Sequence, residues 1–179
     1  MKKTCYQLMI LTTAAVLTCN FGFAEDESKD LYEGQRKLAM TVTAEDLELA
    51  EEPPFRTVMM ESSSEDGVLT LISSADGSCS VYFSNGGGVI AACDKSPAAR
   101  SAALKFRQTV EKNLKLLKPV KEYPRPNSGS TVLYANTAKG FLKLDPTKEI
   151  SKAEDEYMTS VAEAGQALIL EIHKVSEAG

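Results

Sequence analysis

The chain of 179 residues has no tryptophan, a single histidine and few aromatic residues, 7% in all. One histidine without cysteines beside it cannot form a zinc site of the usual composition, and it supplies no Ser-His-Asp set. The lack of tryptophan argues against a carbohydrate cleft, because ligand pockets are lined largely by apolar and aromatic side chains. His173 lies near the end of a predicted helix, where the helix dipole favours a cation. We therefore predict no catalytic residues, no metal site and no cofactor.

The sequence also lacks an apolar run of the roughly 20 residues that a transmembrane helix needs. The apolar stretch at residues 8–17 follows two lysines and is followed by small residues at positions 22 and 24, which is the pattern of a secretory signal peptide. We expect cleavage after Ala24 and an exported protein, either periplasmic or secreted. The alternative is a lipoprotein signal with lipid on Cys19, although Thr18 before that cysteine fits the pattern poorly.

Charge is unevenly distributed along the chain. Residues 25–54 hold ten acidic and three basic residues, whereas residues 55–179 hold 15 of each, so the net charge of the expected mature chain belongs to its first thirty residues. Such composition predicts an acidic, solvated and mostly flexible leader, with marginal helices at 30–40 and 44–51. The pair Pro53-Pro54 is expected to end it as a stiff, extended boundary.

The neutral remainder contains a basic window, residues 95–125, with nine bases and only two acids. These bases are either the solvated face of a helix or a binding surface for an unknown protein or an anionic envelope component, such as lipid head groups or a polyanionic glycan. The acidic leader could fold back over the same surface. Nucleic acid is not expected, because the pI is about 5.1 and no aromatic residues interleave with the bases. The candidate surface consists of Lys105, Lys112, Lys115, Lys118 and Lys121.

Four short strands separated by turn signals are predicted between residues 57 and 93. Asp-Gly and Asn-Gly pairs supply the positive φ angles that hairpin turns need, so the strands should form an antiparallel meander. The predicted strands are 57–61, 68–73, 79–84 and 89–92.

Two cysteines remain after the expected signal cleavage, Cys79 and Cys93. A hairpin that turns symmetrically about Gly86 places them opposite each other, and an oxidising compartment favours their pairing. We therefore predict a cross-strand disulfide. A redox-active pair is the alternative, but the close Cys-x-x-Cys spacing that lowers a thiol pKa is absent.

The glycines at the tip of this hairpin, Gly86, Gly87 and Gly88, have two interpretations. They lack the Lys-Ser/Thr ending of a phosphate-binding loop, so a hairpin turn explains them better. Gly88 is one glycine more than the turn needs, which indicates a bulge or a site where another backbone approaches closely.

After Cys93 the apolar period changes to that of a helix. Ser96 and Pro97 form a helix start, and an apolar stripe continues to Leu117. A second hairpin is predicted at 131–135 and 141–144, followed by a helix from Ser151, where Ser-x-x-Glu is a capping box, to Val175. The apolar stripe of this last helix is wide enough to contact two surfaces.

These elements predict one α+β domain at residues 55–179, with an antiparallel sheet of about five or six short strands covered by two amphipathic helices. The order of elements over residues 57–175 resembles that of profilin and roadblock proteins, in which a sheet covered by helices is often used for dimerisation or peptide binding. A homodimer through the sheet edge or the C-terminal helix is a candidate assembly. The resemblance is one of element order only.

Every recognisable pattern thus has a structural explanation, and we expect a non-catalytic exported binding or assembly module. The alternatives are a small carboxylate-dependent hydrolase or lyase, for which acidic residues are plentiful, and a lipid-anchored envelope protein through Cys19.

Overall fold

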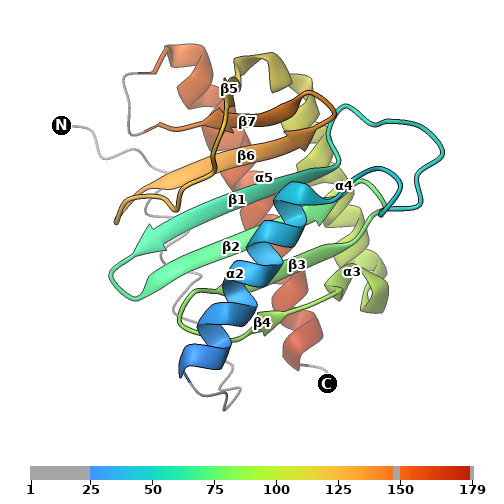
Figure 1. Ribbon diagram of the computed structural model, residues 1–179, viewed down its shortest axis with the longest axis vertical. Helices are drawn as coiled ribbons and strands as arrows, with labels where there is room; N and C mark the ends of the chain where they lie inside the picture. The colour runs from blue at the N-terminus through green and yellow to red at the C-terminus, as the bar shows by residue number, and fades with distance from the viewer. Residues whose placement is uncertain (1–24, 147–149, 178–179) are drawn as a thin grey trace.

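The computed structural model describes residues 25–146 and 150–177, with side chains from Leu31 onward. The predicted signal peptide and Cys19 lie outside the described residues. Figure 1 shows three layers, in which one sheet separates helix α2 from helices α4 and α5. The elements are α2 (Glu25–Thr41), β1 (Thr57–Ser64), β2 (Gly67–Ser74), β3 (Cys79–Phe83), β4 (Gly88–Val89), α3 (Ala92–Lys95), α4 (Pro97–Lys112), η1 (Leu114–Leu116), β5 (Lys118–Val120), β6 (Thr131–Thr137), β7 (Gly140–Leu144) and α5 (Lys152–Glu177).

The sheet has seven strands in the order β4-β3-β2-β1-β6-β7-β5, and every neighbouring pair is antiparallel. The predicted antiparallel α+β class is confirmed, and so are the meander and the second hairpin. The strand that the sequence did not indicate is β5, which has three residues and lies at an edge of the sheet.

Helix α4 begins as predicted, because the Ser96 hydroxyl accepts a hydrogen bond from the Ala99 N–H at 3.2 Å and Pro97 occupies the first helical position. It ends at Lys112 and not at the end of the predicted stripe, because the chain turns through η1 into β5. Leu117 is nevertheless buried against the core, so the apolar pattern identified a buried residue correctly but not its helical conformation.

Helix α5 begins at the predicted capping box. The Glu154 carboxylate accepts hydrogen bonds from the Ser151 N–H and hydroxyl, both at 2.8 Å, and the Ser151 hydroxyl accepts one from the Glu154 N–H at 3.3 Å. These bonds to the charged form hold the pKa of Glu154 below its usual value. The wide apolar stripe of α5 is buried within this chain, and Gly165 lets the helix lie directly against Met60 of β1.

Helix α2 lies on the other face of the sheet, where the sequence predicted a mostly flexible, solvated leader. The helix expected at 30–40 is present within α2, but Tyr32, Arg36 and Met40 are buried, so the prediction that this part of the leader is flexible and solvated was wrong. The expected helix at 44–51 is instead a series of turns at 44–48. The physical reason for the packing of α2 is a set of polar contacts with the strands, which the composition of the segment does not reveal.

Successive side chains of a strand point to opposite faces of the sheet, so the same strands contact α2 on one face and α4 and α5 on the other. In β1, Val58 and Met60 join the large apolar cluster beneath α4 and α5, whereas Met59 and Glu61 face α2. We call these sides the inner face and the outer face. Both faces are covered, and the outer cover is the helix of the acidic segment.

Candidate functional site

The most unusual group of the outer face is a fully buried carboxylate, Glu61 of β1, with 0% of its surface exposed. Arg36 of α2 binds it with two hydrogen bonds, from Nε to Oε1 at 2.7 Å and from Nη2 to Oε2 at 2.9 Å. A carboxylate at this depth requires a partner of opposite charge, and the planar guanidinium supplies two parallel bonds. No sequence pattern indicated this pair, because its members lie on different elements and charged residues are usually exposed.

Two hydroxyls complete the environment of the carboxylate. Thr70 of β2 donates to Glu61 Oε1 at 3.0 Å, while the Tyr32 hydroxyl lies 3.2 Å from the same oxygen and 2.8 Å from the Thr70 hydroxyl. Arg36 Nη2 also donates to the backbone carbonyl of Tyr123. We call Tyr32, Arg36, Glu61 and Thr70 the polar clamp; it joins α2 to the central strand β1 and its neighbour β2.

The ionisation states of the polar clamp favour a structural role. Burial and the negative charge of Glu61 raise the pKa of the Tyr32 hydroxyl far above its ordinary value, so it stays protonated. Burial alone would lower the pKa of Arg36, but the hydrogen bond and charge of Glu61 outweigh it and the pKa is raised. A guanidinium that keeps its charge and a hydroxyl that keeps its proton are suited to holding the helix on the sheet.

Further contacts attach the loop before β6 to the same helix. The Arg125 guanidinium lies 4.8 Å from the centre of the Tyr32 ring and forms an ion pair with Glu33. Arg36 lies 5.3 Å from the centre of the Tyr123 ring. Cation–π contacts of this kind add stabilisation where the cation is shielded from water.

The predicted disulfide is present between Cys79 of β3 and Cys93, with a Cα–Cα distance of 5.3 Å. Its geometry differs from the prediction, because Cys93 lies in the short helix α3 and not on a strand. The β3–β4 register pairs Val81 with Val89, whereas symmetry about Gly86 would pair Val81 with position 91. A shift of two residues keeps the same side chains on the inner face. Cys93 lies beyond the end of β4, so the disulfide joins strand β3 to the short helix α3.

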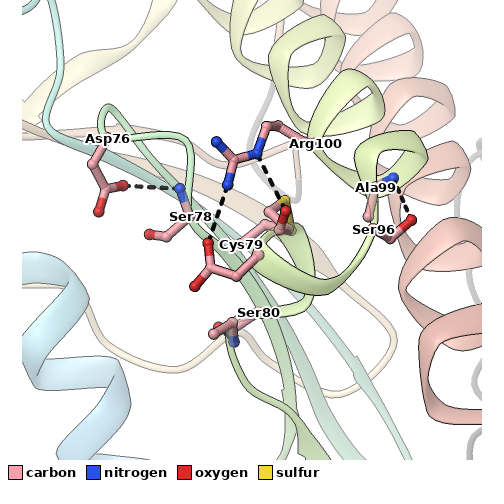
Figure 2. The surroundings of a disulfide bond; sticks show 10 residues. Asp76, Ser78, Cys79, Ser80, Ser96, Ala99 and Arg100 are labelled. Atoms are coloured by element: carbon pink, nitrogen blue, oxygen red, sulfur yellow. Dashed lines mark hydrogen bonds and ion pairs between the residues drawn. A yellow bond between two sulfur atoms is a disulfide. The ribbon is translucent and has the colours of Figure 1, made fainter. Parts of the chain in front are cut away.

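Figure 2 shows the surroundings of the disulfide. Arg100 of α4 donates from Nε to the carbonyl oxygen of Cys93 at 3.2 Å, and its Nη2 lies 3.3 Å from an Asp94 oxygen. Cys79 and Cys93 are each 1% exposed, so the bond is shielded from exchange with thiols in solution. This environment is that of a structural disulfide.

The three glycines form the β3–β4 turn. The Gly87 carbonyl accepts a hydrogen bond from the Phe83 N–H at 3.1 Å, and Gly88 has a φ of 151°. A Cβ on Gly88 would lie 2.3 Å from the carbonyl oxygen of Val81. The close backbone approach at Gly88 is therefore made by the chain's own strand β3.

The lysine surface (Lys105, Lys112, Lys115, Lys118 and Lys121) follows α4 through η1 to β5, and all five side chains are exposed. Lys118 lies 3.8 Å from Glu154, and among the described residues the other four form no ion pair. Helix α2 lies on the opposite side of the sheet and does not cover α4. The expectation that the acidic leader folds over the basic helix was therefore wrong for the described part of the leader.

His173 is the remaining candidate that the sequence singled out. It lies in the last turns of α5, and its Nε2 is 3.5 Å from a carboxylate oxygen of Glu177, one helical turn further on. Within residues 25–146 and 150–177, no three histidine, cysteine or acidic side chains form a group that could hold a metal ion. The helices of the same ranges include none with the length and apolarity needed to cross a bilayer.

The structure thus contains two surfaces built from named residues, the clamped helix on the outer face and the lysine surface beside the β5 edge. Comparisons of the chain with protein-family models, with curated proteins and with solved structures gave no match.

Proposed function

We propose that this protein is an exported, non-catalytic binding module that attaches to anionic lipid head groups through its lysine surface. The observation that carries the proposal is the run of exposed lysines from α4 to β5, four of which have no acidic partner among the described residues. Unpaired ammonium groups on one continuous segment attract an anionic surface without losing an internal ion pair.

The spacing of the lysines supports this role. Lys105 and Lys112 are seven residues apart on α4 and therefore lie on the same side of the helix, away from the buried stripe of Ala103, Phe106 and Val110. Lys115, Lys118 and Lys121 continue the run at intervals of three residues. Each lysine close to an anionic membrane contributes about 1 kcal/mol, which falls off within a Debye length of about 8 Å at physiological salt.

The disulfide supports the exported location that the sequence predicts, because such bonds persist in oxidising compartments. The net charge of the chain does not oppose attachment to an anionic surface, because the acidic helix α2 and the lysine surface lie in different layers.

The carboxylate-dependent hydrolase has no comparable support. Glu61 is a fully buried carboxylate among the described residues, and its oxygens already accept bonds from Arg36 and Thr70. A general acid or base needs access to substrate, which a fully buried and fully paired group lacks. We therefore propose no catalytic activity.

The test is cosedimentation of the purified protein with vesicles of phosphatidylglycerol or of phosphatidylcholine. We expect salt-sensitive binding to the anionic vesicles only. The double variant Lys112→Gln/Lys115→Gln should bind about 30-fold more weakly, from about 1 kcal/mol for each lysine. The matched control, Lys95→Gln/Lys174→Gln, removes the same charge from exposed positions outside the surface and should bind like the parent.

Three results would contradict the proposal: no binding to phosphatidylglycerol vesicles, binding that persists at high salt, or equal losses in the two double variants. Binding to a soluble sulfated glycan without binding to vesicles would keep the lysine surface but replace lipid as its partner.

A further inference from the structure

Helix α2 carries apolar side chains on its exposed side as well as on the side that packs against the sheet. Its sheet side carries the buried residues Tyr32 and Arg36, while Leu31 and Leu38 are 47% and 58% exposed. The two leucines are seven residues apart and lie on the same side of the helix. Gly34 lies between them, and a Cβ built on it meets nothing within 4 Å. The exposed leucines and Gly34 therefore form an apolar strip on the side of α2 that faces away from the sheet.

Helix α2 is also a rigid platform for such a surface. The polar clamp fixes it to β1 and β2, and the Tyr82 hydroxyl of β3 donates to Gln35 Oε1 at 3.2 Å. Near its end the Thr57 hydroxyl donates to the Ala39 carbonyl. A surface held in one conformation loses little entropy on binding.

The charge pattern of α2 favours a second copy of the same helix as its partner. Lys37 is exposed, lies three residues after Gly34 and forms no ion pair among the described residues. The part of α2 before Gly34 contains five acids and one base, including an aspartate at position 30, four residues before Gly34. Antiparallel copies therefore bring Lys37 towards the acidic half of the partner helix, whereas parallel copies bring like charges together.

The apolar positions obey the same symmetry. Leu31 and Leu38 lie three residues before and four residues after Gly34, so a two-fold axis beside Gly34 places Leu31 of one copy against Leu38 of the other. Gly34, without a side chain, lets the two backbones approach at the crossing point. The antiparallel crossing at Gly34 therefore brings the leucines of the two copies together and also places Lys37 of each copy near the acidic half of the other.

We propose that this protein forms a two-fold dimer in which α2 packs antiparallel against α2 of a second copy, crossing at Gly34. An anionic membrane does not fit this surface, because α2 carries five acids against three bases. The sheet edges are poorer candidates for self-association, since β4 has two residues and β5 contains Pro119, which cannot donate a backbone hydrogen bond. The wide stripe of α5 is already buried within the chain.

The first test is sedimentation equilibrium of the purified protein at concentrations up to about 0.1 mM, a range that detects a dimer of micromolar Kd. Leu31→Gln/Leu38→Gln should weaken the dimer about a hundredfold, because both Leu31–Leu38 contacts are lost and all four leucines are replaced in each dimer. Leu104→Gln/Leu170→Gln changes two leucines that are 51% and 45% exposed on the other helices and should leave the dimer intact. Lys37→Glu should also weaken it, whereas Lys105→Glu should not.

The second test determines orientation by cross-linking with a short bismaleimide. A mixture of Leu31→Cys and Leu38→Cys proteins should give the mixed 31–38 dimer, because the axis brings these positions together. Each variant alone should cross-link poorly, since two copies of position 31 lie about 10 Å apart along the helices.

A parent protein that is monomeric at all concentrations would overturn the proposal. So would a dimer that the α2 variants leave unchanged, or efficient cross-linking of Leu31→Cys with itself. Circular dichroism and thermal unfolding of each variant distinguish a lost contact from a lost fold. The vesicle test uses a different surface, so either proposal can fail alone.

Discussion

The two faces of the sheet are covered by helices through different physical means. On the inner face, α4 and α5 pack through apolar side chains, with the Cys79–Cys93 disulfide as a covalent tie. On the outer face, α2 is held by a buried ion pair and hydroxyls, with a smaller apolar cluster around them. Apolar packing tolerates substitutions of similar volume, whereas a buried charge requires one particular partner. The inner face should therefore be robust and the outer face specific.

The largest effect is expected from removing one member of the ion pair. Arg36→Met leaves the Glu61 carboxylate buried and without its positive partner, which typically costs about 3–5 kcal/mol. Urea unfolding followed by circular dichroism measures the loss. On the inner face, Met60→Leu conserves volume and should cost less than about 1.5 kcal/mol.

The double variant Arg36→Met/Glu61→Leu sharpens this comparison. It removes both charges, and Tyr32 and Thr70 can still pair with each other at their 2.8 Å separation. Its stability should return to within about 1 kcal/mol of the parent, because replacing both ions by apolar groups is often neutral or stabilising. If Arg36→Met alone proves harmless, the pair does not hold α2 on the sheet.

A smaller effect is expected from the covalent tie of the inner face. The disulfide joins residues 14 apart in sequence, and in the loop-entropy model a closed loop of about 15 residues contributes about 3 kcal/mol. Cys79→Ala/Cys93→Ala should lose about that much in urea unfolding while keeping its secondary structure. A reducing agent should change the stability of the parent but not of the variant; an unchanged parent under full reduction would contradict the assigned contribution.

Alkaline pH should act on both faces, through three buried tyrosines of the outer face and one of the inner face. Burial raises the pKa of Tyr32, Tyr82 and Tyr134, which face α2, and of Tyr157 on the inner side. A raised pKa means that the fold binds the proton more tightly, so its contribution is complete below the unfolded value of about 10 and is lost as pH rises through the folded value.

Each such tyrosine should lower the free energy of unfolding by up to about 1.4 kcal/mol per pH unit above pH 10. Urea unfolding between pH 9 and 11.5, together with tyrosinate absorbance, measures the slope and the number of ionising groups. Tyrosines that ionise at ordinary pH without loss of stability would show that their burial does not stabilise the fold.

The inner face was largely predictable from the sequence. Its strands alternate, α4 and α5 have apolar stripes with recognisable caps, and two of the four cysteines lie in the predicted domain. The errors there were local. The β3–β4 pairing is shifted by two residues from the predicted hairpin that is symmetric about Gly86. The edge strand β5 has three residues, one of them a proline, and is too short to show an alternating apolar pattern.

The outer face could not be predicted in the same way. Its decisive residues, Arg36 and Glu61, are of types that composition assigns to solvent, and they are 25 residues apart in sequence. The acidic residues around Arg36 indicated a solvated segment, and they do lie in a helix whose outer side is exposed. Only the structure shows that the same helix has a side that fits the polar positions of β1 and β2.

The position of the disulfide in the chain has a consequence for the order of folding. Strands β1 to β4 and Cys93 form a continuous local segment, whereas β1 meets its other neighbour β6 only through pairs such as Met59 with Tyr134, about 75 residues apart. Local hairpins form before distant pairings because their loops close at lower entropic cost. The two cysteines are therefore brought together within the first half of the domain. We expect the Cys79–Cys93 disulfide to form there before β6 pairs with β1.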